Sequence, residues 1–204
     1  MEKSNLNSRR EFLQKLLTAS AVAGLYPYMN TVNGADAVLK KGKMPLRPLG
    51  KTGHMVGIYS LGGQATVETP GKEDLAVQII NKAIDLGINY IDTAAAYGRS
   101  SATLTKENAM GTSEKNIGQV MKTRRKEVFL ASKTHDRTYG GSMRLIEKTL
   151  KNLQTDHLDL WQIHNVKKAE ITEIDKWFAA DGVVKAMEKM RDKKVIRFSG
   201  ITGH

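Results

Sequence analysis

The stretch Gly87-Ile88-Asn89-Tyr90-Ile91-Asp92 decides the fold, because it is a short apolar run that follows a helical pattern and ends in a carboxylate. The residues before it repeat at helical spacing, and a glycine ends that helix. The apolar face of this helix consists of Ala76, Ile79, Ile80, Ala83 and Ile84. A helix that leads directly into a short apolar strand is the repeating unit of a parallel sheet with crossover helices.

The same unit recurs along the chain. Further strands are expected over residues 128–133, 158–164 and 195–201. Three more helices are expected between and after these strands, with inward faces formed by Ile117, Val120 and Met121, then by Met143, Ile146, Leu150 and Leu153, then by Val183, Ala186, Met187 and Met190. Residues 46–53 predict a hairpin ahead of a first barrel strand over about Met55–Leu61.

These patterns predict an α/β fold, a parallel (β/α) barrel of the TIM type that is incomplete, with about five of its eight strands in residues 38–204. A closed barrel of this kind takes eight strands and about 250 residues. The 204-residue chain therefore suggests a fragment of a longer reading frame, a truncated gene, or a half-barrel that associates with a second copy.

Three of the expected strands end in polar residues that can carry chemistry: Asp92, Lys133 and His164, with Tyr97 in the loop after the first of them. Side chains alternate between the two faces of a strand, so these polar residues point toward the barrel axis. The opposite positions, which should pack on the helices, are Ile91, Val128, Leu130, Trp161 and Ile163. Barrel enzymes place their active sites at this C-terminal rim.

The four residues, in this order on successive units, resemble the tyrosine, lysine, aspartate and histidine tetrad of the aldo-keto reductase family. The flanking sequences also follow that family's pattern: Asn89–Thr93, Ala96–Gly98, Gly111–Glu114 and Gly118. The resemblance covers roughly Met44–His204. It implies an oxidoreductase that reduces an aldehyde or ketone with a nicotinamide cofactor.

The resemblance assigns each tetrad residue a role. Tyr97 would donate a proton to the developing alkoxide, although a free phenol, with a pKa of about 10, is poorly matched to neutral pH. Lys133 would stabilise the phenolate through its ammonium charge. Asp92 would keep the lysine charged and aimed, and His164 would hydrogen-bond the carbonyl oxygen of the substrate.

The cofactor would be NADP(H) more readily than NAD(H), because the formal net charge of +11 suits a phosphorylated dinucleotide. The basic residues are scattered, which argues against nucleic-acid binding. No Gly-x-Gly-x-x-Gly follows an expected strand, in agreement with a family that binds the dinucleotide across the barrel rim. Thr202 and Gly203 stand where the family usually has a serine and an asparagine that hold the carboxamide. Thr202 keeps a hydroxyl there, whereas Gly203 supplies no amide.

Other interpretations remain open. A metal-dependent barrel hydrolase could use His135, His164 and His204 with Asp92 as ligands, and an inactive truncated product would have neither activity. The loop of residues 99–110 is longer than the family usually has, which predicts either altered substrate access or a neutral insertion. His54 and His157 are expected to be solvated or structural.

Residues 1–37 read as a signal peptide of the twin-arginine type. Residues 8–15, Ser-Arg-Arg-Glu-Phe-Leu-Gln-Lys, resemble the export motif, an apolar stretch follows over Leu16–Leu25, and Ala35-Asp36-Ala37 offers a cleavage site. The apolar stretch is too short to span a bilayer. The alternative is an amphipathic helix or an uncleaved anchor. The chain has no cysteine, which excludes disulfides and a lipoprotein anchor. A periplasmic protein, exported folded by the twin-arginine machinery and without a stable membrane anchor, is therefore expected.

Overall fold

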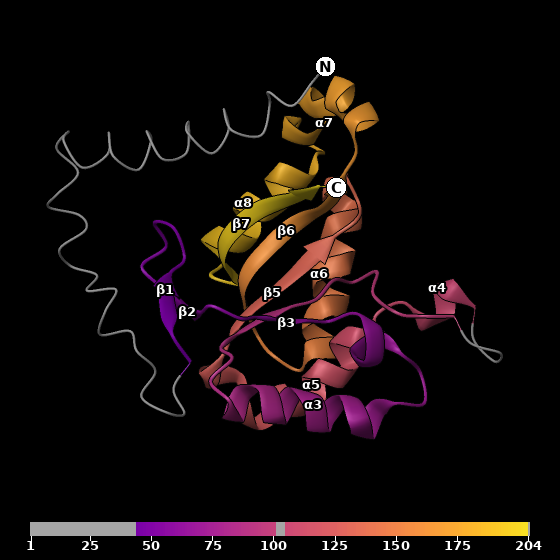
Figure 1. Ribbon diagram of the computed structural model, residues 1–204. Helices are drawn as coiled ribbons and strands as arrows, with labels where there is room; N and C mark the ends of the chain where they lie inside the picture. The colour runs from indigo at the N-terminus through magenta and orange to yellow at the C-terminus, as the bar shows by residue number, and fades with distance from the viewer. Residues whose placement is uncertain (1–43, 101–104, 204) are drawn as a thin grey trace, which may run out of the picture. The chain divides into compact units, whose positions relative to one another are not determined.

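The computed structural model describes residues 44–100 and 105–203, which belong to the compact unit Lys43–His204 (Figure 1). The expected signal peptide and His204 lie outside the described residues, so the interpretation of both stays a prediction. Within the described part of the chain, no helix is long and apolar enough to cross a membrane.

Five strands form one parallel sheet in their order along the chain. They are β3 (Leu61–Gly62), β4 (Tyr90–Asp92), β5 (Phe129–Thr134), β6 (Leu158–Val166) and β7 (Ile196–Gly203). The register places Asp92 opposite Ala131 and Lys133 opposite Gln162. Neighbouring strands thus bring the C-terminal ends that carry the expected site to the same edge of the sheet.

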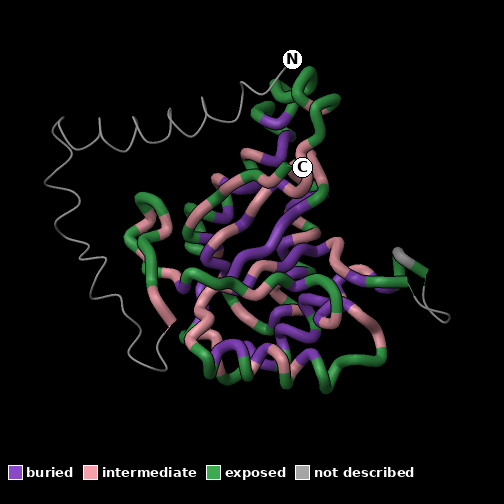
Figure 2. The backbone as a smooth tube through the Cα atoms, viewed as in Figure 1, coloured by how far each residue is buried: buried purple, intermediate pink, exposed green. Residues whose placement is uncertain are grey.

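Four helices cover one face of this sheet: α3 (Glu73–Asp85), α5 (Thr112–Arg124), α6 (Tyr139–Leu153) and α8 (Val183–Asp192) (Figure 1). Most of their expected inward residues pack in one core with the strand residues Ile91, Leu130, Trp161 and Ile163. In α3, Val77 packs against this core, whereas the expected Ile79 is only half-buried. The buried stretches in Figure 2 follow the strands and the sheet-facing sides of these helices. The alternation inferred from the sequence is confirmed for this face.

Shorter elements complete the described fold. They are the helices α4 (Lys106–Ala109) and α7 (Ile174–Phe178) and the 3-10 turns η1 (Ala65–Glu68), η2 (Arg125–Glu127) and η3 (Lys168–Glu173). The other face of the sheet carries stacked aromatic rings, with Tyr90 5.2 Å and Phe198 6.2 Å from Phe129 between ring centroids. The ring of His54 lies 4.8 Å from Phe129, so this histidine is structural, one of the two roles expected for it.

The first barrel strand differs from the expectation. Residues Met55–Gly57 form β2, which pairs antiparallel with β1 (Leu46–Pro48), and the barrel strand is only Leu61–Gly62. The side chain of Asn89 fixes this arrangement, since it accepts from Gly57 N at 2.7 Å and donates to Met55 O at 2.9 Å. The apolar run read as one strand is therefore split by a bend at residues 58–59.

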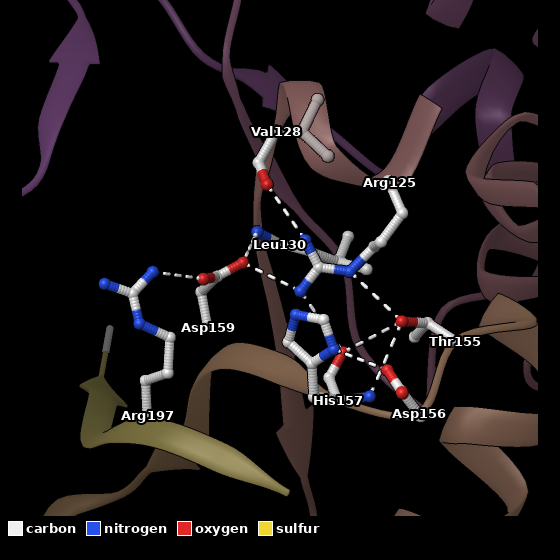
Figure 3. Close-up of polar contacts among 8 residues, drawn as sticks. All are labelled: Arg125, Val128, Leu130, Thr155, Asp156, His157, Asp159 and Arg197. Carbon is white, nitrogen blue, oxygen red and sulfur yellow. Dashed lines mark hydrogen bonds and ion pairs between the residues drawn. The ribbon is translucent and has the colours of Figure 1, made fainter. Parts of the chain in front are cut away.

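A buried ion cluster lies where β5, β6 and β7 begin, at the strand ends opposite to the expected site. Figure 3 shows its residues. Asp159 accepts hydrogen bonds from Arg125 Nη2 at 2.8 Å, Arg197 Nη1 at 2.6 Å and Leu130 N at 2.9 Å. Burial alone would raise the pKa of the Asp159 carboxyl, but the Leu130 N–H and the Arg125 guanidinium outweigh it and hold that pKa below its usual value. The cluster ties β5, β6 and β7 together where the strands begin.

Candidate active site

The structure brings Asp92, Tyr97, Lys133 and His164 together at the C-terminal rim of the sheet. Lys133 is the centre of the group and is 4% exposed. Its ammonium donates to Asp92 Oδ2 at 2.5 Å, to the backbone oxygen of Thr93 at 2.8 Å and to the Tyr97 hydroxyl at 3.2 Å. An ammonium has three donors, and all three are used here. The buried charge is therefore satisfied and held in one orientation.

Tyr97 and His164 complete the group. The two rings meet edge to face with centroids 5.5 Å apart, and Lys133 Nζ lies 4.8 Å from the centre of the phenol ring. Because Lys133 donates to the phenol oxygen, the proton of the Tyr97 hydroxyl is left to point elsewhere. The arrangement can donate a proton from Tyr97 and stabilise the phenolate that remains. The catalytic roles of the four residues stay predictions.

The N-terminal end of α5 fixes the strand ends that carry this group. Glu114 is fully buried and accepts from Ser132 Oγ at 2.8 Å, Thr149 Oγ1 at 2.8 Å and Asn152 Nδ2 at 3.1 Å. Burial raises the pKa of the Glu114 carboxyl, although these hydrogen bonds oppose the shift. Ser132 directly precedes Lys133, so the network supports β5 at the site. In the sequence, Glu114 stands out only as part of the family pattern, and no local signal predicts this role.

The long loop after Tyr97 is anchored at both of its ends. Arg99 Nε lies 3.1 Å from Glu68 Oε1, and the backbone nitrogens of Gly111 and Ser113 donate to Tyr97 O at 3.0 and 3.4 Å. Gly98 has no room for a side chain, since a Cβ there would lie 1.7 Å from the Ala109 oxygen. Residues 101–104 lie outside the described residues, so the effect of the loop on substrate access stays a prediction.

A pocket of 420 Å³ opens beside the group. Its lining residues are Ala96, His135, Arg137, His164, Asn165, Lys167 and Glu170. Arg137 ties the wall together, because it forms a two-point ion pair with Glu170 at 2.8 and 3.2 Å and donates to His164 O at 2.9 Å. Apart from His164, His135 and Ala96, the sequence did not point to these residues, because most of them lie between the regular elements and Asn165 lies at the end of β6.

The two positions expected to hold the cofactor lie at the end of β7. Thr202 Oγ1 accepts from Asn165 N at 3.0 Å and still has its own proton to donate. Gly203 pairs with Val166. A nicotinamide carboxamide needs a donor and an acceptor. The Thr202 hydroxyl can both donate and accept, so it fits that end of the cofactor.

The metal-site alternative has no support in the described residues, which hold no group of three or more metal-ligating side chains. One of its expected ligands, His204, lies outside them. His135 lines the pocket, and burial lowers the pKa of its imidazole. His157 sits at the surface, where its Nδ1 lies 2.5 Å from Asp156 Oδ1.

Comparisons with known proteins agree with the fold. Residues 55–204 match the Aldo/keto reductase family, and the chain belongs to it. The sequence is 30% identical to L-galactose dehydrogenase of Arabidopsis thaliana over 172 residues, which cover 79% of this chain and 49% of that protein. It is 31% identical to methylglyoxal reductase of Escherichia coli strain K12 over 140 residues, 66% of this chain and 41% of that protein.

Solved structures place the fold in the same family. The holo form of an aldo-keto reductase from Bacillus halodurans matches with a TM-score of 0.62 and 27% identity, over 78% of this chain and 50% of that one. An aldo-keto reductase from Klebsiella pneumoniae in complex with NADPH matches with a TM-score of 0.58 and 28% identity, over 74% and 47%. The chain spans about half the length of these relatives. The fold is thus an incomplete α/β barrel of the TIM type, as predicted.

Proposed function

We propose that the protein reduces an aldehyde or ketone to an alcohol by hydride transfer from a nicotinamide cofactor, with Tyr97 as the proton donor. The observation that carries the proposal is the hydrogen bond from buried Lys133 to the Tyr97 hydroxyl, with Asp92 on the same ammonium. The bound cofactor supplies the hydride. Each step assigned to the chain concerns the substrate oxygen and its proton.

The substrate carbonyl would bind beside His164, in reach of the Tyr97 hydroxyl. As negative charge develops on its oxygen, Tyr97 gives up its proton, and the phenolate is stabilised by the neighbouring ammonium. Asp92 and the Thr93 carbonyl keep that ammonium in place through the transfer. His164 provides a second polar contact that orients the carbonyl. Because Lys133 is buried, its charge stabilises the phenolate more strongly than it would in water.

We further propose NADP(H) as the preferred cofactor. The net charge of +11 suits the additional phosphate of this dinucleotide. The relative from Klebsiella pneumoniae was solved with NADPH bound, which supports the proposal. Thr202 would hold the carboxamide end of the nicotinamide.

Export is a separate proposal, supported by the twin-arginine pattern of residues 8–15 and the small residues at 35–37. A protein of this kind would be folded in the cytoplasm and carried to the periplasm by the twin-arginine machinery. Its partners would then be that machinery and a small carbonyl substrate.

The reduction is tested by Tyr97→Phe, which removes one oxygen without changing the shape of the ring. Turnover of a small aldehyde with NADPH should fall by about 10²–10⁴-fold, the usual cost of losing a general acid. NADPH binding, followed by fluorescence, should be retained. Tyr90→Phe is the matched control, because it removes the same oxygen from a phenol that is a poor proton donor. Burial and then the Asp92 carboxylate raise the pKa of Tyr90 to about 12. Equal turnover in the wild type and Tyr97→Phe would refute the assignment.

A further inference from the structure

We propose that the pocket beside His164 binds a carboxylate, so that the carbonyl substrate of this site carries an anionic group recognised by Lys167, Asn165 and His135. The inference rests on the proposed function and adds the chemical class of its substrate. It is carried by the balance of charges and hydrogen bonds in the pocket wall.

The pocket is suited to a small polar ligand in reach of the carbonyl site. Its volume of 420 Å³ falls in the range of ligand sites. Its wall is fixed to the strand that carries His164, because Arg137 Nη2 donates to the His164 oxygen at 2.9 Å. The guanidinium of Arg137 also lies over the Trp177 ring at 5.3 Å. A ligand that fills this pocket therefore meets a preformed wall.

The carboxylate of Glu170 is already satisfied. Its Oε1 accepts from Arg137 Nε at 2.8 Å, and its Oε2 accepts from Arg137 Nη2 at 3.2 Å and Lys167 N at 2.8 Å. The guanidinium and the Lys167 N–H hold the pKa of the Glu170 carboxyl below its usual value. Glu170 thus remains charged, with Arg137 as its ion-pair partner, and the charge of Lys167 also lowers the pKa of its carboxyl.

What remains in the pocket is an excess of positive charge and of donors. The ammonium of Lys167 forms no ion pair with any residue that the structure describes. The neighbouring acid, Asp136, turns away, because it accepts from the nitrogen and hydroxyl of Thr138 at 2.8 and 2.7 Å at the start of α6. The Lys167 ammonium, on an exposed residue of the pocket lining, is therefore available to an anionic ligand.

A bulge at the end of β6 places the Asn165 side-chain amide in the pocket wall. The register between β6 and β7 shifts between Ile163 and Val166, and Asn165 has a φ of 54°. Bulges near active sites often re-aim a side chain, and a left-handed non-glycine residue is rare elsewhere. Here the bulge follows His164 directly and leaves the Asn165 side chain in the pocket lining. An amide beside an unpaired ammonium is well suited to a carboxylate.

The test compares an acid with its uncharged amide in binding, which needs no turnover. Isothermal titration with 5-hydroxypentanoate and 5-hydroxypentanamide, with and without NADP⁺, should show the acid bound about three- to tenfold more tightly at low salt. Lys167→Gln should abolish the difference. Lys168→Gln, a neighbouring exposed lysine outside the pocket lining, should preserve it. Equal binding of acid and amide by the wild type, or a preference unchanged in Lys167→Gln, would overturn the inference.

The corresponding aldehydes separate this inference from the proposed reduction. The value of kcat/KM should favour 5-oxopentanoate over 5-oxopentanamide, and only Lys167→Gln should remove that preference. Reduction of both aldehydes at equal rates would leave the reaction standing and remove the anionic substrate class. A preference for the acid in binding, with no reduction of either aldehyde, would refute the reaction while supporting a carboxylate-binding pocket.

Discussion

Asp159→Asn should destabilise the fold strongly, because this carboxylate is the buried centre of an ion cluster. The Asp159 side chain is 6% exposed, and that of its partner Arg125 is 14% exposed. Asparagine keeps the shape but removes the charge and presents an amide to one of the two guanidinium groups. Breaking a buried pair from one side costs about 3–5 kcal/mol. Arg197 is half exposed and contributes little. We therefore expect a loss of about 3 kcal/mol in the free energy of unfolding.

The assay is urea unfolding followed by circular dichroism at neutral pH. Asp85→Asn is the matched control, since it makes the same chemical change in a carboxylate that is 58% exposed and paired with Arg124. An exposed pair contributes about 1 kcal/mol or less. If the two variants lose the same stability, or Asp159→Asn loses less than about 1 kcal/mol, the cluster does not hold the strands as argued.

The pH dependence of the same variant gives a second measurement. The pKa of the folded Asp159 carboxyl lies below its ordinary value of 3.8. Its contribution to stability is therefore fully present well above that value and is lost as the pH falls through it toward the folded pKa. The wild type should lose stability more steeply than Asp159→Asn on acidification. If the free energy of unfolding falls equally with pH in the wild type and in Asp159→Asn, the carboxylate is not stabilised in the fold.

Two further predictions concern the loop and the leader. Gly98→Ala would place a Cβ 1.7 Å from the Ala109 oxygen, so the backbone beside the tyrosine must move, and turnover should fall about 10²-fold with cofactor binding kept. Gly140→Ala, whose Cβ would meet nothing nearer than an arginine side chain at 3.5 Å, should leave turnover unchanged. Lysines in place of Arg9 and Arg10 should hold the precursor in the cytoplasm in a cell fractionation, and processed periplasmic protein from that variant would contradict the export proposal.

The regular part of the fold could be predicted because its signals are local. The helical spacing of Ile80 and Ile84 and the alternation around Leu130 depend only on the period of the element. The strand ends could be predicted equally well, since three consecutive strands end near a polar residue that apolar packing does not explain. The first strand could not be assigned in this way. Met55–Leu61 is short and carries no sign of the bend that an amide 32 residues away, on Asn89, imposes on it.

The buried polar residues show the opposite limit. Glu114 lies on the inward side of α5, where a periodic pattern predicts an apolar residue, and its three partners come from β5 and α6. Nothing local marks a carboxyl that will be buried, because its cost is offset only by hydroxyl and amide groups far along the chain. Asp159 is a similar case, since its partners belong to three different elements.

The catalytic residues of the site can therefore be predicted from the sequence more readily than its substrate specificity. Asp92, Lys133 and His164 are placed by regular strands, so their meeting follows from the parallel register. The neighbouring pocket is built mostly from residues outside the strands and long helices, and its net charge depends on which of its charged residues form ion pairs. Arg137 and Glu170 are 33 residues apart, and their contact leaves Lys167 without an ion-pair partner among the described residues. A composition count would give two cations and one acid without assigning the pair. The substrate class thus depends on contacts between segments far apart in the sequence, such as that of Arg137 with Glu170. It can be tested only when those contacts are known.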